Sequence, residues 1–365
     1  MKNTFGNSIN LTLFGESHGE YIGAVLDGLA PGIKIDHEYI KRKLDLRRPG
    51  GKISTARVEG DEYSIVSGVY NGYTSGTPLC ILIPNTNKKS SDYEKIFDIP
   101  RPSHADFAAG CKYHGFEDKR GGGHFSGRIT AALVAAGAIL QSALENKGIK
   151  IGSHITEMHG AFDRPFENYS EDIDLLNGRR FPTLDTKAEE RMVKEIEKAA
   201  ALSDSVGGIL ESAIIGVPAG VGEPWFDSME SMLSHGLFSI PAVKGVEFGL
   251  GFAFADVYGS EGNDPFAMEG EQVVTTSNNN GGINGGITNG MPIVFRTVIK
   301  PTPSIFKEQA SVSLSEGKNT LLKIEGRHDP AIIHRARAVV DAVAGIVIAD
   351  MLTVRYGTDY LATKE

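Results

Sequence analysis

Four glycines, a serine and two arginines lie within residues 120–130, which read Arg-Gly-Gly-Gly-His-Phe-Ser-Gly-Arg-Ile-Thr. Glycines let a backbone approach a ligand closely, and arginines bind oxyanions through paired hydrogen bonds. A strongly apolar stretch follows to about Leu144 and predicts a buried helix with Ser126 as its N-cap, whose N-terminal amides would also attract an anion. The segment therefore predicts a phosphate or carboxylate site. The alternative is a glycine turn capped by Ser126, with both arginines in solvent.

Two familiar phosphate-binding loops do not fit this segment. A P-loop needs lysine and then serine or threonine after its last glycine, whereas Arg128 and Ile129 follow Gly127 here. It also needs a buried strand before the loop, and residues 116–119 are mostly charged. A dinucleotide-binding loop must close a strand inside a βαβ unit, and that pattern is not met either. We therefore expect an anion site of another kind.

Two histidines lie in turns beside groups that could tune their protonation. His18 follows Ser17 in the Gly-Glu-Ser-His-Gly turn of residues 15–19, and His104 follows Arg101-Pro-Ser. Histidine titrates near neutral pH and can act as an acid or a base. A lone turn histidine is usually an ordinary surface residue, so its neighbours in the fold must decide between the two interpretations.

Two further polar segments adjoin helices. The basic residues 47–52, Arg-Arg-Pro-Gly-Gly-Lys, follow an amphipathic helix expected over 36–46, and their plain interpretation is a solvated helix end. Near the C-terminus, Gly-Arg-His-Asp-Pro precedes a long apolar helix expected over 330–354. Proline suits the first helical position, so Asp329 is the expected N-cap of that helix.

The apolar pattern predicts the elements that position these residues. Strands are expected over residues 9–14, 22–26, 63–70, 79–84, 149–155, 208–217, 243–250 and 291–299, and further helices over 127–144, 190–201 and 226–238. Residues 85–98 are polar and predict an exposed excursion, and the hydrophilic residues 163–188 predict a loop or an insertion before the helix at 190–201. The order of elements recurs, which suggests two similar α+β halves. The Asn- and Gly-rich residues 278–286 are either a floppy loop or one that covers a ligand.

Composition narrows the class of protein. The chain has 365 residues, is 41% hydrophobic and carries a formal net charge of -9, so it can bury a large core but is not expected to bind nucleic acid or membrane surfaces. Locally gathered basic residues instead favour a small anionic ligand. The two cysteines, Cys80 and Cys111, favour a reducing compartment. The first residues contain no apolar signal region, so we expect a cytoplasmic protein without a membrane span.

Six segments, in the same order, resemble the chorismate synthase family. They are Gly15-Glu16-Ser17-His18-Gly19, Arg47-Arg48-Pro49-Gly50, Arg101-Pro102-Ser103-His104-Ala105-Asp106, Arg120-Gly121-Gly122-Gly123, Lys300-Pro301-Thr302 and Gly326-Arg327-His328-Asp329-Pro330. The resemblance runs to about residue 354. It implies an α+β fold with one domain over residues 1–365, a β-α-β sandwich of antiparallel sheets enclosing helices. It also implies a homotetramer.

The resemblance further implies an enzyme of the shikimate pathway of aromatic amino acid biosynthesis. Such an enzyme is a carbon–oxygen lyase acting on a phosphate. Its substrate, 5-enolpyruvylshikimate 3-phosphate, loses phosphate and a ring proton in an anti-1,4-elimination that gives chorismate. The family requires reduced FMN although no net redox change occurs. The reductant is either NADPH bound by the enzyme itself or an external flavin reductase.

The resemblance also assigns roles to single residues. His18 is implied as the acid for the leaving phosphate, and His104 as a proton donor to the flavin. Asp329, with Ser17 and with Ser126 as a further candidate, would carry the proton relayed from the substrate ring through flavin N5. Substrate oxyanions would be bound by Arg47, Arg48, Arg128 and Arg327. The implied flavin contacts are Arg47, Lys52, His124, Phe125, Ser126, Pro241, Ala242, Gly285, Lys300, Pro301, Thr302, Pro303, Ser304 and Arg327.

Three substitutions motivate an alternative function. His124, Pro241 and Pro303 stand where many members of the family have arginine, asparagine and serine. The alternative is a non-catalytic phosphate- or anion-binding protein on the same scaffold that has lost the flavin site. The presence of both His18 and His104 favours the enzyme.

Overall fold

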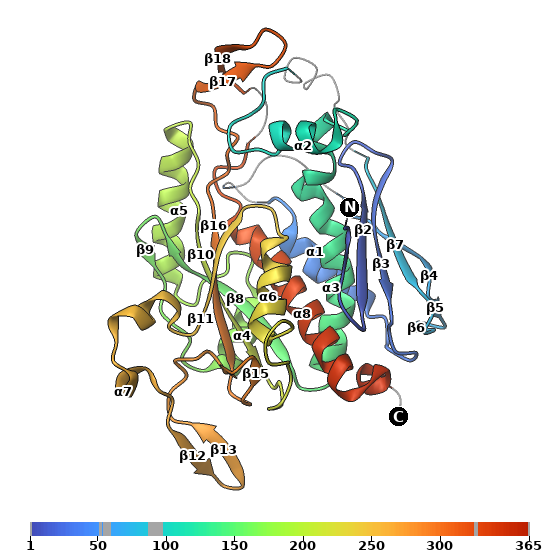
Figure 1. Cartoon of the computed structure of the whole chain (residues 1–365), viewed down its shortest axis with the longest axis vertical. Helices are drawn as coiled ribbons and strands as arrows, with labels where there is room; N and C mark the ends of the chain where they lie inside the picture. Colours follow the sequence, from blue (N-terminus) through green and yellow to red (C-terminus); the bar gives the residue numbers. More distant parts are fainter. Residues whose placement is uncertain (1, 51–52, 54–59, 87–97, 325–327, 364–365) are drawn as a thin grey trace.

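Two five-stranded antiparallel sheets enclose helices α3 (Thr130–Glu145) and α8 (Ile333–Tyr356) (Figure 1). The computed structural model describes residues 2–50, 53, 60–86, 98–324 and 328–363. The first sheet has the order β1 (Thr4–Phe5), β2 (Asn10–Gly15), β3 (Tyr21–Asp27), β7 (Leu79–Pro84), β4 (Ser64–Ser67). The second has the order β11 (Val243–Phe248), β16 (Ile293–Ile299), β10 (Gly208–Ile215), β8 (Lys150–Met158), β9 (Ala161–Phe162).

Helices and small hairpins complete the described part of the chain. The α-helices are α1 (His37–Arg47), α2 (Asp106–Tyr113), α3 (Thr130–Glu145), α4 (Tyr169–Gly178), α5 (Thr186–Ala201), α6 (Met229–Phe238), α7 (Gly259–Gly262) and α8 (Ile333–Tyr356). Short 3-10 helices are η3 (Arg120–Phe125), η4 (Gly127–Ile129), η5 (Gly251–Asp256) and η6 (Thr358–Leu361). The hairpins pair β5 (Val69–Tyr70) with β6 (Tyr73–Thr74), β12 (Phe266–Glu269) with β13 (Gln272–Thr275), β14 (Ile283–Asn284) with β15 (Ile287–Thr288), and β17 (Gln309–Ser313) with β18 (Lys318–Leu322).

The two halves repeat one topology. In the first half the main elements run β2, β3, α1, β4, β7, α3, and in the second half they run β8, β10, α6, β11, β16, α8. The strands also take the same places in their sheets, since β2-β3-β7-β4 corresponds to β8-β10-β16-β11. The prediction of two similar α+β halves and of a sandwich around helices is therefore confirmed.

The core lies between the sheets, where α3 and α8 pack against each other (Figure 1). Alternate residues Leu79, Ile81 and Ile83 of β7 are fully buried against this layer, as the alternating pattern predicts. Residues Gly127–Glu145 are long and apolar enough to cross a membrane, but 83% of their apolar window is buried inside the protein. Burial on this scale identifies a core helix.

Most expected elements appear within a few residues of their predicted bounds, and local caps explain why. Asp36 accepts a hydrogen bond from Tyr39 N at 2.9 Å and begins α1. Ser126 accepts one from Arg128 N at 3.3 Å and caps η4, which leads directly into α3. The N-cap prediction for Ser126 is therefore confirmed, with a short 3-10 turn before the α-helix.

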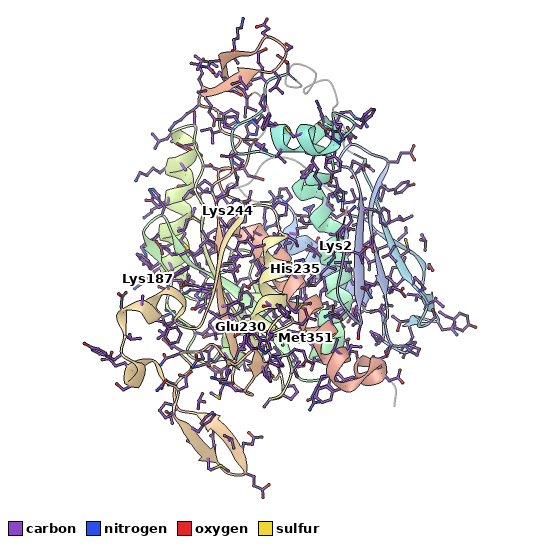
Figure 2. All side chains as sticks on the ribbon, in the orientation of Figure 1. Lys2, Lys187, Glu230, His235, Lys244 and Met351 are labelled. Atoms are coloured by element: carbon purple, nitrogen blue, oxygen red, sulfur yellow. The ribbon has the colours of Figure 1, made fainter. Side chains whose placement is uncertain are left out.

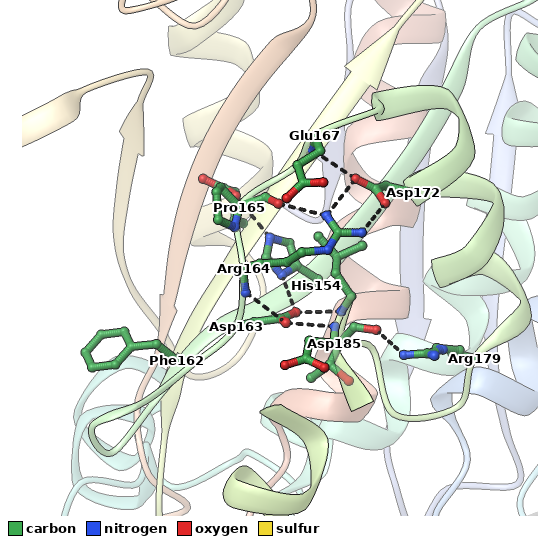
Figure 3. A network of polar contacts seen from close by, with 12 residues as sticks. His154, Phe162, Asp163, Arg164, Pro165, Glu167, Asp172, Arg179 and Asp185 are labelled. Carbon is green, nitrogen blue, oxygen red and sulfur yellow. Dashed lines mark hydrogen bonds and ion pairs between the residues drawn. The ribbon is translucent and has the colours of Figure 1, made fainter. Parts of the chain in front are cut away.

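Two local predictions are wrong. The final helix begins at Ile333 rather than Pro330, and its N-cap is Ile332 without a side-chain cap bond, so Asp329 does not cap it. Residues 163–188 are not a loop throughout, because they contain α4. This helix is anchored by polar contacts that composition alone does not reveal: Arg164 binds Asp172, and His154 binds Asp163, as Figure 3 shows.

The Asn- and Gly-rich loop is built around one carboxylate. Asp264 accepts hydrogen bonds from Asn279 N at 2.7 Å and Asn280 N at 2.8 Å, and from the Ser277 hydroxyl at 2.7 Å. The loop is therefore held by the protein itself, and a floppy loop was the wrong alternative. Of the polar excursion at 85–98, residues 87–97 lie outside the described part of the chain.

Candidate active site

The turn that carries His18 is docked on the glycine loop. Ser17 N donates to Gly123 O at 3.1 Å, and the Ser17 hydroxyl lies 3.1 Å from Gly121 O and 3.1 Å from His18 Nδ1. Nδ1 of His124 lies 2.8 Å from Gly15 O at the other end of the turn. Both Ser17 and His18 are buried. His18 is therefore no ordinary surface histidine, because the glycine loop holds it in place.

Gly121 makes this docking possible. Its φ of 59° lies in the left-handed region, which side chains disfavour. A Cβ at Gly121 would fall 2.1 Å from Cε1 of His18 and 2.7 Å from the Ser17 hydroxyl. Such contacts are far shorter than van der Waals separation, so the position requires glycine for close approach as well as for its backbone angle.

His104 is held by contacts with residues that follow β16. Its Nε2 lies 2.8 Å from the Ser304 hydroxyl, and Lys300 Nζ donates to Ser103 O at 2.8 Å. Two hydrogen bonds of 2.8 Å join the Arg101 guanidinium to Asp106 at the start of α2. The Arg-Pro-Ser-His segment is therefore clamped between α2 and the residues that follow β16.

The surroundings of His104 disfavour its charged form. Burial lowers the pKa of His104 to about 4, and the positive charges of Arg101, Lys300 and His328 act in the same direction while Asp106 opposes them. The sequence-based expectation of a histidine titrating near neutrality is thus not met by His104 in the protein alone. A neutral imidazole still donates one hydrogen bond. Its protonation would require added negative charge in the cavity.

Three predicted substrate-binding arginines surround one carboxylate. The side chain of Asp61 is fully buried; Arg47 Nη2 and Arg48 Nε lie 3.8 and 3.6 Å from its Oδ2, and Arg128 Nη1 pairs with its Oδ1. Burial by itself would raise the pKa of Asp61, but Arg47, Arg128 and Arg48 outweigh it and hold that pKa below its usual range. Arg48 also pairs with Asp45 at 2.6 Å, so the three guanidiniums face two carboxylates and one positive charge remains for a ligand to neutralise.

A cavity of about 1090 Å³ brings most of the predicted residues to one surface. Those lining it are Arg47, His104, His124, Phe125, Ser126, Arg128, Pro241, Ala242, Lys300, Thr302, Pro303 and Asp329. Apolar residues also line the cavity, among them Leu11, Leu133 and Val339. Figure 2 labels Lys2, His235 and Lys244, which also line the cavity.

Other predicted residues lie behind the lining or elsewhere. Ser17 and His18 lie against Gly121, which lines the cavity. Ser304 does not line the cavity, but its hydroxyl lies within hydrogen-bond distance of His104, which does. Arg48 and Pro301 do not line it, although each is the neighbour of a residue that does. Gly285 lies in the β14–β15 turn, at the end of the molecule opposite α2 (Figure 1). Its assignment to this cavity stays a prediction. Lys52 and Arg327 lie outside the described residues.

Sequence reasoning missed Arg335 and Asp61, which pair with predicted residues of this site. Arg335 lines the cavity and pairs with Asp329, and Asp61 pairs with the arginines. The signal for Arg335 was a charged residue in the first turn of a mostly apolar helix. Asp61 gave no such signal, because it is one acid in a polar stretch. Among the described residues, no three His, Cys, Asp or Glu side chains are grouped so that they could hold a metal ion.

Comparison with known proteins places these features in a family. The family model described as "Chorismate synthase" matches residues 9–353. Chorismate synthase from Pyrococcus abyssi is 47% identical over 350 residues, which cover 96% of this chain and 97% of the relative. That of Thermococcus kodakarensis is 44% identical over 347 residues, covering 95% and 96%. A crystal structure of chorismate synthase superposes with a TM-score of 0.76 at 28% identity, covering 98% of this chain and 95% of that chain.

Proposed function

Because the chain belongs to the chorismate synthase family, we propose that it converts 5-enolpyruvylshikimate 3-phosphate to chorismate with reduced FMN bound in the same cavity. The observation that supports this most is the cavity of about 1090 Å³ that gathers Arg47, Arg128, His104 and Asp329. Cavities for single small ligands have volumes of roughly 300–1,000 Å³, so this one has room for a flavin beside a substrate. The reaction is an elimination of phosphate with loss of a ring proton.

The residues present suit such a pair of ligands. The apolar lining residues suit a flat ring system, while Lys300 and the arginines suit phosphate and carboxylate groups. His124, Phe125, Ser126, Ala242, Lys300 and Thr302 are the lining residues that we assign to the flavin. Reduced flavin supplies electron density to the reacting system when it is bound. The side chains of this chain bind the charged groups of the ligands and move protons.

We assign the leaving phosphate to Arg47, Arg128 and His18. The two guanidiniums bind its oxygens, and His18 donates a proton that makes it a better leaving group. The Ser17 hydroxyl, 3.1 Å from Nδ1, orients the imidazole. Ser17 is thus proposed to act beside His18, whereas the family resemblance placed it in the relay with Asp329.

We propose that Asp329 accepts the proton of the substrate ring and that His104 stabilises negative charge. Asp329 lines the cavity and, as a carboxylate, can accept the proton that leaves the substrate ring. His104 is a neutral donor in the protein alone, because burial lowers its pKa to about 4. The negative charges of bound ligands favour its protonated form, so the site gains a positive charge only when it is loaded.

Family membership also supports proposals about localisation, assembly and the source of electrons. We propose a cytoplasmic homotetramer whose chain forms one domain, which obtains reduced flavin either with NADPH or from an external reductase. Light scattering would measure the assembly. Oxidation of NADPH by the purified protein with FMN, in the absence of any reductase, would distinguish the two sources of electrons.

One experiment separates the enzyme from a non-catalytic anion-binding protein. Photoreduced FMN and 5-enolpyruvylshikimate 3-phosphate are mixed anaerobically with the protein, and phosphate release and chorismate are followed. If the chain is the enzyme, phosphate and chorismate should appear in equal amounts. Binding of the substrate without phosphate release, under conditions in which FMN stays reduced, would instead establish the anion-binding protein.

A further inference from the structure

Arg335 connects two parts of the candidate site. It lies in the first turn of α8, and its Nε donates to Arg47 O at 3.0 Å, at the C-terminal end of α1. Its Nη1 pairs with Oδ2 of Asp329. Both Arg335 and Asp329 line the cavity. One guanidinium therefore connects the backbone of α1 to a carboxylate that lines the cavity.

The start of α8 explains why Asp329 needs such a partner. An N-cap aspartate is oriented by the helix amides that it binds. Here the helix begins at Ile333, so Asp329 lies ahead of it in a non-helical segment. Pro330 O accepts a hydrogen bond from Val206 N at 2.8 Å, which anchors the backbone beside it. The ion pair with Arg335 fixes the direction of the carboxylate itself.

The geometry suits arginine rather than a generic cation. The side chains of Arg335 and Asp329 are only 17% and 13% exposed, so solvent screens the pair less than it would at the surface. Guanidinium nitrogens point in fixed directions, so one group can bind a carbonyl and a carboxylate together. Lysine offers a point charge that cannot make both contacts in the same geometry.

We propose that Arg335 is a positioning residue, which is anchored on Arg47 O and fixes the Asp329 carboxylate, so that turnover depends on Arg335 through Asp329. The inference rests on the proposed function, in which Asp329 accepts the ring proton. A misplacement of a reacting group by about 1 Å can lower a rate by roughly 10²-fold. A purely structural ion pair would leave the rate of the bound complex unchanged.

The test is a double-mutant cycle on kcat with full-length protein, reduced FMN and substrate. Arg335→Gln should lower kcat by about 10- to 100-fold with a much smaller change in KM. Arg335→Lys should recover part of that loss, because it restores the charge next to Asp329. In the Asp329→Asn background, Arg335→Gln should cause little further loss, since residues that act as one unit are not additive.

Arg355→Gln is the matched control, because it makes the same change in the last turn of α8, where Arg355 packs on Tyr356. It should leave kcat and KM unchanged. Thermal unfolding of all variants checks that they fold. If Arg335→Gln does not fold, Arg335→Lys replaces it in the double-mutant cycle. A loss of kcat in the lysine variant that is equally large in the Asp329→Asn background would overturn the inference.

Other outcomes separate this inference from the proposed function. Wild-type kcat in Arg335→Gln together with an inactive Asp329→Asn would reject the inference and leave the function standing. A rise in KM with unchanged kcat would show that Arg335 acts on substrate binding through Arg47, and would also reject it. Full activity of Asp329→Asn would reject the proton role of Asp329, and the inference with it.

Discussion

The two histidines of the site differ in what surrounds them. His18 is bound to Ser17 and lies against Gly121, whereas His104 is enclosed by Arg101, Lys300 and His328. Burial and like charge make the neutral form of His104 the stable one. His18 is therefore suited to protonate the leaving group, whereas His104 is suited to become charged once the ligands are bound.

At this scale we expect His18→Ala and His104→Ala each to lower kcat by roughly 10²–10⁴, the usual contribution of a positioned acid or base. Steady-state rates with reduced FMN measure the effect, and circular dichroism verifies the fold. His37→Ala is the control, because His37 is exposed at the start of α1 and pairs only with half-buried Tyr63 among the contacts described. Near-wild-type turnover in either site variant would return that histidine to a structural role.

The low pKa of His104 predicts proton uptake on ligand binding. The folded protein alone holds His104 neutral at pH 7, since its pKa is about 4, and the anionic substrate should raise that value. Calorimetry of substrate binding without FMN, in two buffers of different ionisation enthalpy, measures the uptake. His104→Ala should take up fewer protons than the wild type. Equal uptake by both proteins would mean that His104 does not titrate with the substrate.

At the scale of elements, the site depends on contacts between segments distant in the chain. The turn between β2 and β3 binds η3, and the segment after β16 binds the segment before α2. In each contact a side chain of one segment donates to a backbone carbonyl of the other, so the site geometry of each segment depends on its partner. Substitutions that touch these contacts should therefore change activity more than stability.

Gly121→Ala tests the contact between the turn and the glycine loop. The added methyl group would collide with His18 and Ser17, so we expect kcat to fall by at least about tenfold, as part of the contribution of His18 is lost. Gly115→Ala is the matched control, because Gly115 has a φ of 82° but nothing lies within 4 Å of the position that its Cβ would take. Both variants carry the backbone cost of about 1–2 kcal/mol, and only Gly121→Ala carries the collision. Equal kcat values of Gly121→Ala and Gly115→Ala would show that the structure accommodates the methyl group at position 121 without loss of activity.

A buried histidine network ties β8, β10 and the segment before α4 together (Figure 3). His154 lies 2.9 Å from Asp163 and 3.0 Å from Glu211, and two carboxylate acceptors require both ring nitrogens to be protonated. Burial opposes this charge, but the hydrogen bonds to Asp163 and Glu211 outweigh it and raise the pKa of His154 above its usual value. The stabilising charge is thus fully present below about pH 6.5, the value for an unfolded chain, and is lost as pH rises through the folded pKa.

His154→Gln tests this network. We expect the variant to be less stable by about 3–5 kcal/mol at pH 6, the cost of breaking a buried ion pair. The difference from the wild type should shrink as pH rises through the folded pKa of His154, where the wild type loses its own charge. Urea unfolding over a series of pH values from 6 upward measures it. His159→Gln is the control, because His159 pairs with Glu195 at 2.8 Å but its side chain is 66% exposed. A difference that stays constant with pH would contradict the charged state of His154.

At the scale of the whole molecule, the cavity lies where the two halves meet. The first half supplies His104, Arg128 and the glycine loop, and the second supplies Lys300 and Asp329. The relative placement of the halves depends on the packing of α3 against α8. At their crossing a Cβ on Gly137 would fall 2.6 Å from Cβ of Ala342 and 2.8 Å from its Cα.

We expect Gly137→Ala to destabilise the protein by about 1–3 kcal/mol, because overpacking forces the two helices apart. Thermal and urea unfolding measure the loss, and KM should rise as the halves of the cavity separate. The control is Gly178→Ala at the end of α4, where nothing lies within 4 Å of the new methyl group. That variant should be neutral or slightly more stable, since alanine favours helix. A neutral Gly137→Ala would show that the helices can adjust.

The sequence by itself determined the local parts of this protein. Apolar periodicity and capping residues such as Asp36 depend on neighbours a few positions away, so the strands, most helices and the motif residues could be predicted. The tertiary structure decided the rest, because its contacts join residues far apart in the chain. Ser17 meets Arg120 and His104 meets Ser304 across 103 and 200 positions, and no local pattern encodes these pairs. For the same reason, the low pKa of His104, the arginines around Asp61 and the partner of Asp329 emerged only when packing fixed burial and charge.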